Sequence, residues 1–112
     1  MNIDTLRELC HSLPHTEEDI KWGHDLCFTV GKKMYCVTGL EGEFSCSVKV
    51  QPEEFEELIS REDIISAPYV GRFKWILIKS GEALDKKEWK YFVTQSYDLI
   101  KSKLSKKTLL SL

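Results

Sequence analysis

The sequence predicts an α+β fold in which a single antiparallel sheet of four to five strands packs against an N-terminal and a C-terminal helix. The first supporting observation is size, because 112 residues that are 42% hydrophobic suffice for one domain with one core. The second is an amphipathic helical period near each end of the chain. The third is a series of short alternating segments between them, separated by turn residues. We therefore expect residues 1–112 to form one domain.

The first predicted element is a short amphipathic helix that ends at Pro14. Asn2 supplies a side chain that can cap its first turn. The apolar residues recur at the spacing of one helical face: Ile3, Leu6, Leu9, Cys10 and Leu13.

A strand and a hairpin are predicted next. Thr16–Trp22 is the first candidate strand, although its three consecutive acidic residues are unfavourable in a sheet. Asp25–Val30 and Lys33–Thr38 form the two hairpin strands, which are joined by Gly31-Lys32. Glycine at the first of two loop positions predicts a type II′ turn.

The predicted turn determines the register of this hairpin. It places Cys27 opposite Cys36 as a non-hydrogen-bonded pair, with Cα atoms about 4.5 Å apart. The core-facing side then holds Leu26, Phe28, Val30, Tyr35 and Val37. No two cysteines form a C-x-x-C motif, so we expect free thiols that are mostly buried.

The middle of the chain continues with a strand, a helix and another strand. Glu43–Val50 alternates apolar and polar residues, which predicts a half-buried strand. Pro52 opens a helix whose glutamates lie on its solvent side. Ile64–Gly71 is expected to be irregular because proline and glycine interrupt it. Phe73–Lys79 carries apolar residues on both faces, which predicts an interior strand.

The last predicted element is a long amphipathic helix. Asp85 and Glu88 match the pattern of a capping box at its start. Its inner stripe consists of Trp89, Phe92, Val93, Ser96, Tyr97, Ile100 and Leu104. The final residues, Thr108–Leu112, are expected to fray.

The charge balance excludes a uniformly basic protein that coats nucleic acid. The chain has 16 Lys plus Arg against 18 Asp plus Glu, for a net charge of −2. Residues 1–63 carry 6 basic and 14 acidic side chains, a net charge of −8. Residues 64–112 carry 10 basic and 4 acidic side chains, a net charge of +6. Negative charge is therefore concentrated in the first part of the chain and positive charge in the second. Whether the cations lie on one surface depends on the fold.

A series of short motifs extends over nearly the whole chain, from residue 1 to residue 107. In order they are Leu13-Pro14, Glu17-Glu18-Asp19, Lys21–Met34, Ile64–Tyr69, Arg72–Trp75 followed by Leu84, Gln95–Ile100 and Lys103–Lys107. Their order and spacing resemble the MmcQ/YjbR family of small bacterial proteins. The closing segment departs from the family in one respect, because Ser105 stands where the family often has proline.

The resemblance implies an α+β fold similar to that of the bacterial frataxin homologue, with a double-wing arrangement of hairpins. Family members are commonly labelled DNA-binding on the basis of that fold. A fold alone does not establish a function. The resemblance therefore adds a DNA-binding expectation that the residues themselves must support.

The leading hypothesis is a non-enzymatic DNA-binding protein with double-stranded DNA as its partner. Binding requires cations where the phosphate backbone can meet them. Lys32 and Lys33 at the hairpin tip, with Arg72 and Lys74 before the late strand, are the predicted contacts. The Arg72 guanidinium can donate two hydrogen bonds at once to a phosphate or to a guanine edge, whereas the lysines act as point charges. The competing interpretation is that these cations only keep the surface soluble.

The second hypothesis is a small-molecule- or protein-binding module. Aromatic side chains beside glycine and proline residues can line a shallow pocket. The candidates are Trp22, His24, Tyr69 and Trp75. The competing interpretation is that the two tryptophans belong to the core or its cover and that His24 caps the end of a strand.

Neither catalysis nor a cofactor is expected. His24 and Asp25 are adjacent in a strand and point to opposite faces, so Asp25 cannot readily orient the imidazole. No nucleophile elbow, phosphate loop or H-E-x-x-H motif is present. No metal site is expected, although Glu17-Glu18-Asp19 beside His15 leaves weak iron binding as an alternative.

No apolar run approaches the length of a membrane span, and the first residues do not form a signal peptide. Four cysteines are too few for a disulfide scaffold of this size. We therefore expect a cytoplasmic protein that is a monomer or a weak homodimer.

Overall fold

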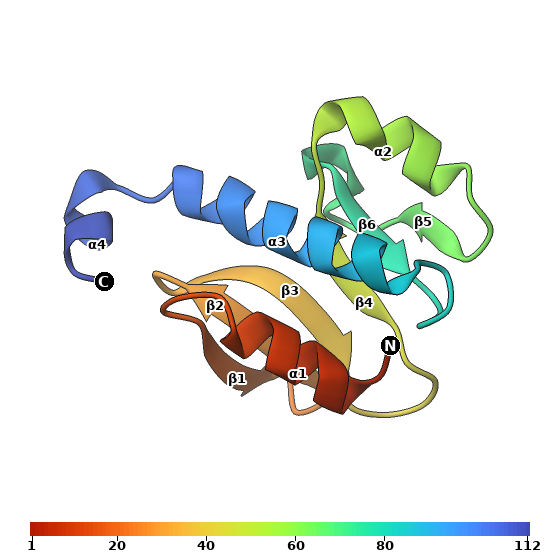
Figure 1. Ribbon diagram of the computed structural model, residues 1–112, viewed down its shortest axis with the longest axis horizontal. Helices are drawn as coiled ribbons and strands as arrows, with labels where there is room; N and C mark the ends of the chain where they lie inside the picture. Colours follow the sequence, from red (N-terminus) through yellow and green to blue (C-terminus); the bar gives the residue numbers. More distant parts are fainter.

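Six strands form one antiparallel sheet in the order β1-β2-β3-β4-β6-β5 (Figure 1). The computed structural model describes residues 1–112. The strands are β1 (Glu17–Lys21), β2 (Asp25–Val30), β3 (Lys33–Gly39), β4 (Cys46–Lys49), β5 (Ile64–Ser66) and β6 (Trp75–Ile78). The helices are α1 (Ile3–His11), α2 (Pro52–Ile59), α3 (Lys86–Ser102) and α4 (Lys106–Leu110), and η1 (Gly71–Phe73) is a single 3-10 turn. The predicted α+β class and single antiparallel sheet are confirmed.

The sheet has six strands where the sequence predicts four to five. The additional strand is β5, which lies in a segment expected to be irregular. Ile64 pairs with Ile78 and Ser66 with Ile76 along β6. Three residues are too few for alternation to reveal a strand, and Pro68 follows almost at once. Pairing with β6 therefore determines this strand more than its own sequence does.

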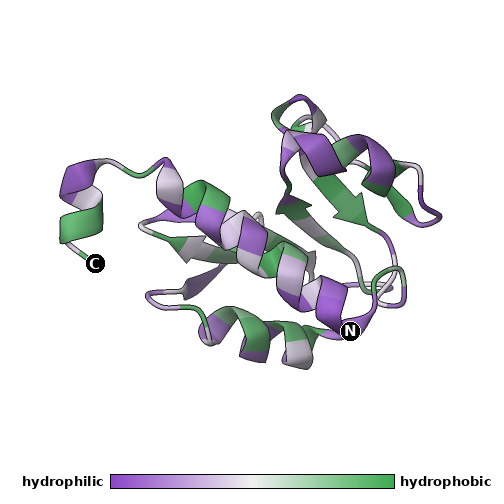
Figure 2. Cartoon of the chain, turned by 45° about the horizontal axis from the view of Figure 1, so that its top comes forward, coloured by the Kyte–Doolittle hydropathy of each residue, from purple (hydrophilic) through white to green (hydrophobic).

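The helices α1, α2 and α3 pack on one face of the sheet and share a single core with it (Figure 1). Figure 2 shows hydrophobic strands beneath α2 and hydrophilic residues along the outer side of that helix. The largest fully buried side chains come from all layers: Trp89, Tyr35, Phe28, Leu6, Leu58, Ile64, Ile76 and Ile78. Burial of side chains of this size is the main source of stability in a domain of this length.

A β-bulge changes the register of the β2–β3 hairpin from the predicted one. Val30 faces Lys33 and Thr29 faces Met34 as expected, but Phe28 then faces Cys36. Tyr35 is the extra residue. It is buried against α1 and α3, where its hydroxyl donates to the Cys10 carbonyl and its ring stacks edge-on against Tyr97.

The bulge corrects two predictions about the faces of the hairpin. Cys27 lies opposite Val37 and not opposite Cys36, so the predicted Cys27–Cys36 pair is wrong. Val37 moves to the outer face, whereas Cys36 joins the helix-covered face and its Sγ lies 3.4 Å from Cys46 Sγ. All four cysteines are free and buried, which confirms the expectation of buried thiols.

The tip of the same hairpin is a type I′ turn. Gly31 has φ +56° and Lys32 has φ +67°, and two positive φ values define type I′, whereas type II′ requires only the first. A Cβ atom on Gly31 would lie 2.7 Å from Leu104 Cδ1. Glycine therefore permits both the turn and the close approach of the segment that follows α3.

The segment after α3 is helical where fraying is expected. Ser105 caps α4 by accepting a hydrogen bond from the Thr108 N–H, a cap that a proline at this position would not provide. Leu104, just before this cap, packs against the core. Capping and this apolar contact together hold the C-terminal residues near the hairpin tip.

A hydroxyl group of α3 is inserted where β3 and β4 separate. The ladder between these strands ends at the pair Cys36–Val48, so Tyr35 and Lys49 would form the next pair. Ser96 lies between them instead: its Oγ donates to the Tyr35 carbonyl at 2.6 Å and accepts from the Lys49 N–H at 2.9 Å. The side chain of Ser96 is fully buried. This residue therefore links the two halves of the sheet and holds the end of β4 in place.

Candidate nucleic-acid interface

The strand register brings the two predicted DNA-contacting regions to the same end of the sheet. β3 begins at Lys33, next to the hairpin tip, and runs antiparallel to β4. β4 ends at Lys49, opposite Trp75 at the start of β6. Lys32 and Lys33 therefore lie at the end that also holds Arg72 and Lys74 in and after η1. The twist of the sheet spreads the hairpin tip and η1 apart at this end (Figure 1).

Two further lysines lie between these regions. Lys49 belongs to β4, which separates β3 from β6 in the sheet. Burial lowers the pKa of Lys49, and the nearby positive charge of Lys103 at the end of α3 lowers it further. Like charges are therefore close enough here to repel each other. We define the basic end as the six residues Lys32, Lys33, Lys49, Arg72, Lys74 and Lys103.

The cations of the basic end are not neutralised by carboxylates. No ion pair in the structure includes a lysine or Arg72. The Arg72 guanidinium lies 4.7 Å from the centre of the Phe73 ring, and the Lys74 ammonium lies at the same distance from the Phe55 ring. The acidic residues at this end lie on its flanks: Glu17 on the edge strand β1, and Glu53 and Glu54 in the first turn of α2. The charges are therefore available to an anionic partner.

The opposite end of the sheet is rich in acidic residues. It carries the β3–β4 loop, the α2–β5 connection and the segment between β6 and α3. These loops carry two cations, Arg61 and Lys79, against six carboxylates: Glu41, Glu43, Glu62, Asp63, Glu82 and Asp85. The charge asymmetry of the folded protein thus runs along the strands. It does not follow the division of the sequence into halves, because the basic end takes Lys32, Lys33 and Lys49 from the acidic half.

Sequence reasoning missed Lys49 and Lys103 as members of this surface. Lys49 is the last polar residue of a half-buried strand. The alternation of apolar and polar residues along this strand predicts that the Lys49 side chain lies near solvent. Lys103 ends the long helix. What the sequence does not reveal is that α3 returns along the sheet and brings Lys103 next to Lys49.

The four aromatic residues of the alternative pocket do not come together. Trp22 and His24 lie in the β1–β2 turn, at the end of the sheet opposite to Trp75 and Tyr69. Three strand spacings also separate β2 from β6, which is roughly 14 Å. Trp22 and Tyr69 are exposed, whereas Trp75 is buried at the start of β6. These residues therefore cannot line one shared pocket.

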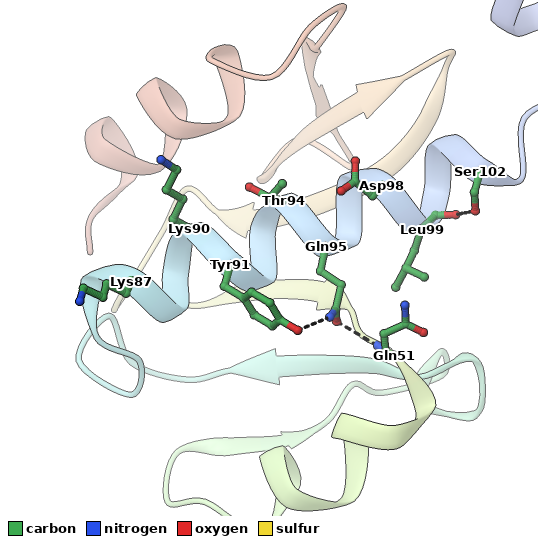
Figure 3. A pocket seen from close by; sticks show the side chains of 9 residues that line it. All are labelled: Gln51, Lys87, Lys90, Tyr91, Thr94, Gln95, Asp98, Leu99 and Ser102. Carbon is green, nitrogen blue, oxygen red and sulfur yellow. Dashed lines mark hydrogen bonds between the residues drawn. The ribbon is translucent and has the colours of Figure 1, made fainter.

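A hollow of about 720 Å³ lies along α3, away from all eight predicted site residues (Figure 3). Tyr91, Gln95 and Leu99 point from α3 toward Gln51 at the start of α2. Gln95 accepts a hydrogen bond from the Gln51 N–H and donates one to Glu54, which also accepts from the Tyr91 hydroxyl. These polar groups hold α2 against α3, which gives them a structural role.

One carboxylate of the acidic run in β1, that of Glu18, contacts α1. Glu18 accepts hydrogen bonds from Arg7 Nε and Nη2, each at 3.1 Å, and its Oε1 lies 2.6 Å from His11 Nε2. His15, which the sequence places beside this acidic run, does not take part in the cluster. The structure has no group of three or more His, Cys, Asp or Glu side chains arranged to hold a metal ion.

The Glu18 cluster predicts a specific dependence of stability on acid. Hydrogen bonds from His11 and from Arg7 lower the pKa of Glu18 below its ordinary 4.5. A lowered pKa in the folded state contributes stability above the unfolded value, and that stability is lost as the pH falls through the folded value. We expect Glu18→Gln to show a smaller loss of unfolding free energy between about pH 5 and pH 3 than the parent protein, measured by urea denaturation. Glu8→Gln, which removes an unpaired carboxylate, is the control, and an acid dependence unchanged by Glu18→Gln would contradict the expectation.

Comparison with known proteins places the chain in a family. The YjbR family model matches residues 11–99. No curated protein sequence matches the chain significantly.

None of the helices of this chain has both the length and the apolar character that crossing a membrane requires.

Solved structures show the same fold. Protein DR2400 of Deinococcus radiodurans, which carries the domain DUF419, is similar with a TM-score of 0.87 and 25% sequence identity, over 98% of this chain and 86% of that one. A protein from Pseudomonas syringae is similar in fold with a TM-score of 0.74 and 22% identity, over 88% of this chain and 98% of that one. The family match over residues 11–99, which is most of the chain, establishes that the chain belongs to the YjbR family.

Proposed function

We propose that this chain is a non-enzymatic, cytoplasmic DNA-binding protein that contacts the phosphate backbone through its basic end. The observation that carries the proposal is the gathering of six unpaired cations from distant parts of the sequence at one end of the sheet. Phosphate contacts of this kind supply most of the affinity of sequence-independent DNA binding. The net charge of −2 is no objection, because the carboxylates at the basic end lie on its flanks, whereas the loops of the opposite end carry six.

The proposal assigns different roles to the two projecting regions. The β2–β3 hairpin presents Lys32 and Lys33 at its tip, and η1 presents Arg72. These two regions are the counterparts of the wings that the family resemblance implies. Lys49 and Lys103 lie between them and add charge where a phosphate backbone would bridge the two regions. Arg72 is the one member whose planar fork suits a phosphate or a guanine edge.

The proposal is tested by fluorescence anisotropy on a labelled mixed-sequence duplex of about 20 base pairs, titrated at several salt concentrations. We expect a dissociation constant in the micromolar range at about 50 mM salt, weakening steeply by about 200 mM. If all six cations contact phosphates, the plot of log K against log salt has a slope of roughly −5. Absence of binding at tens of micromolar protein in low salt would refute the proposed function.

A further inference from the structure

The loop between β5 and β6 exposes aromatic side chains at one side of the basic end, next to Arg72 and Lys74. Tyr69 is 98% exposed and Phe73 is 51% exposed, and Val70 between them is also on the surface. Single exposed apolar residues are ordinary, but a group of them within five residues indicates a contact site. The sequence predicts Tyr69 only as part of a pocket that the structure does not form.

These aromatic residues belong to a loop that is held in a defined conformation. Hydrogen bonds connect the Val70 N–H to the Pro68 carbonyl, the Phe73 N–H to Val70, and the Lys74 N–H to Gly71. Tyr69 and Lys74 have left-handed backbones, with φ of 67° and 69°. Backbone strain of this kind persists only where the surrounding structure enforces it. The exposure of Tyr69 therefore does not result from a lack of local structure.

The loop is also tied to the cations. The Arg72 guanidinium stacks on Phe73, and the Lys49 ammonium donates to the Phe73 carbonyl. Aromatic faces and unpaired cations thus alternate over a short distance. This combination matches a single-stranded nucleic acid, whose bases offer free π faces and whose phosphates offer negative charge. A duplex keeps its base faces stacked inside, so it offers this loop no free face for its aromatic rings.

We propose that the loop from Tyr69 to Phe73 stacks on unpaired bases, so that the basic end prefers single-stranded DNA to duplex DNA. This inference rests on the proposed function, because the cations of the basic end must first hold the phosphates. It adds the class of partner, a single strand or a locally opened duplex. Each stacked base adds binding free energy whatever its identity, because every base has a π face.

The test compares two probes that share one labelled strand. Anisotropy is measured on a fluorescein-labelled oligothymidylate and on its duplex with oligoadenylate, in the same low-salt buffer. We expect Tyr69→Ala and Phe73→Ala each to weaken binding of the single strand about tenfold and to change duplex binding less than about twofold. Tyr69→Phe keeps the ring, so it should retain most of the single-strand affinity. Trp22→Ala is the control, because Trp22 is an exposed aromatic residue (66%) in the β1–β2 turn, at the opposite end of the sheet.

The outcomes of this test distinguish failure of the stacking inference from failure of the phosphate-binding proposal. Equal affinity of the parent protein for both probes, or equal losses on both probes in Tyr69→Ala, overturns the stacking inference and leaves the phosphate-binding proposal in place. A loss in Trp22→Ala as large as that in Tyr69→Ala overturns it as well. No binding of either probe refutes the proposed function and the inference together. Loss of the single-strand preference only in the two loop variants supports both.

Discussion

Ser96→Ala is expected to lower the free energy of unfolding by about 2–4 kcal/mol, although it removes a single oxygen atom. The Ser96 hydroxyl satisfies the Tyr35 carbonyl and the Lys49 N–H at the point where β3 and β4 separate. Alanine leaves both backbone groups without a partner, and each unsatisfied buried group costs about 1–3 kcal/mol. The strands cannot close on each other to compensate, because α3 lies against them at this point. In a thermal melt followed by circular dichroism, the midpoint should fall by about 10 °C.

The control for this prediction is Ser102→Ala on the same helix. The Ser102 hydroxyl donates to the Leu99 carbonyl on the exposed side of α3, so its loss should change stability by less than about 0.5 kcal/mol. Similar melts for the two variants would mean that water or a shift of β4 satisfies the Tyr35 and Lys49 groups. In that case Ser96 would not be the link between the two halves of the sheet.

The sequence was sufficient for the elements whose signals are local. The capping box at Asp85 and Glu88 is present as predicted, and the β2 strand has the predicted limits. The helical period also assigned Ser96 to the buried stripe of α3. It could not show that Ser96 bridges two strands, because that role depends on where the β3–β4 ladder ends.

The hairpin shows why register is harder to predict than strand limits. The turn at Gly31-Lys32 determines only the first pairs, and the bulge at Tyr35 then shifts every later pair by one residue. Burial of Tyr35 against Cys10 and Tyr97 favours the bulge, and both partners lie far away in the sequence. Local turn chemistry contains no information about such contacts.

The sequence was sufficient to identify four residues of the basic end, but not all six. The hairpin tip and the segment before β6 were identified from turn residues and charge, and the sheet register places them at one end. Lys49 and Lys103 joined them only through the strand order, in which β4 inserts between β3 and β6. The acidic character of the opposite end has the same origin, because it assembles loops that are distant in the chain.

Reversing three charges of the basic end is expected to weaken DNA binding by on the order of 100-fold at low salt. The variant carries Lys32→Glu, Lys33→Glu and Arg72→Glu, which places carboxylates where both projecting regions would meet phosphates. Because these contacts no longer release counterions, the slope of log K against log salt should become shallower by about 3. The side chains are exposed and have no ion-pair partners, so the fold should be unaffected. Anisotropy on the mixed duplex over a range of salt concentrations measures both quantities.

The matched control reverses three lysines at the opposite end of the sheet. Lys79→Glu, Lys86→Glu and Lys87→Glu give a protein of the same net charge, with the new carboxylates near the start of α3. If DNA binding depends on the basic end, this control should lose less than about tenfold in affinity, by general repulsion alone. Equal losses in the two variants would show that only the overall charge matters, and the basic end would then have no special role. A large loss confined to the first variant would locate the phosphate contacts on the hairpin tip and η1.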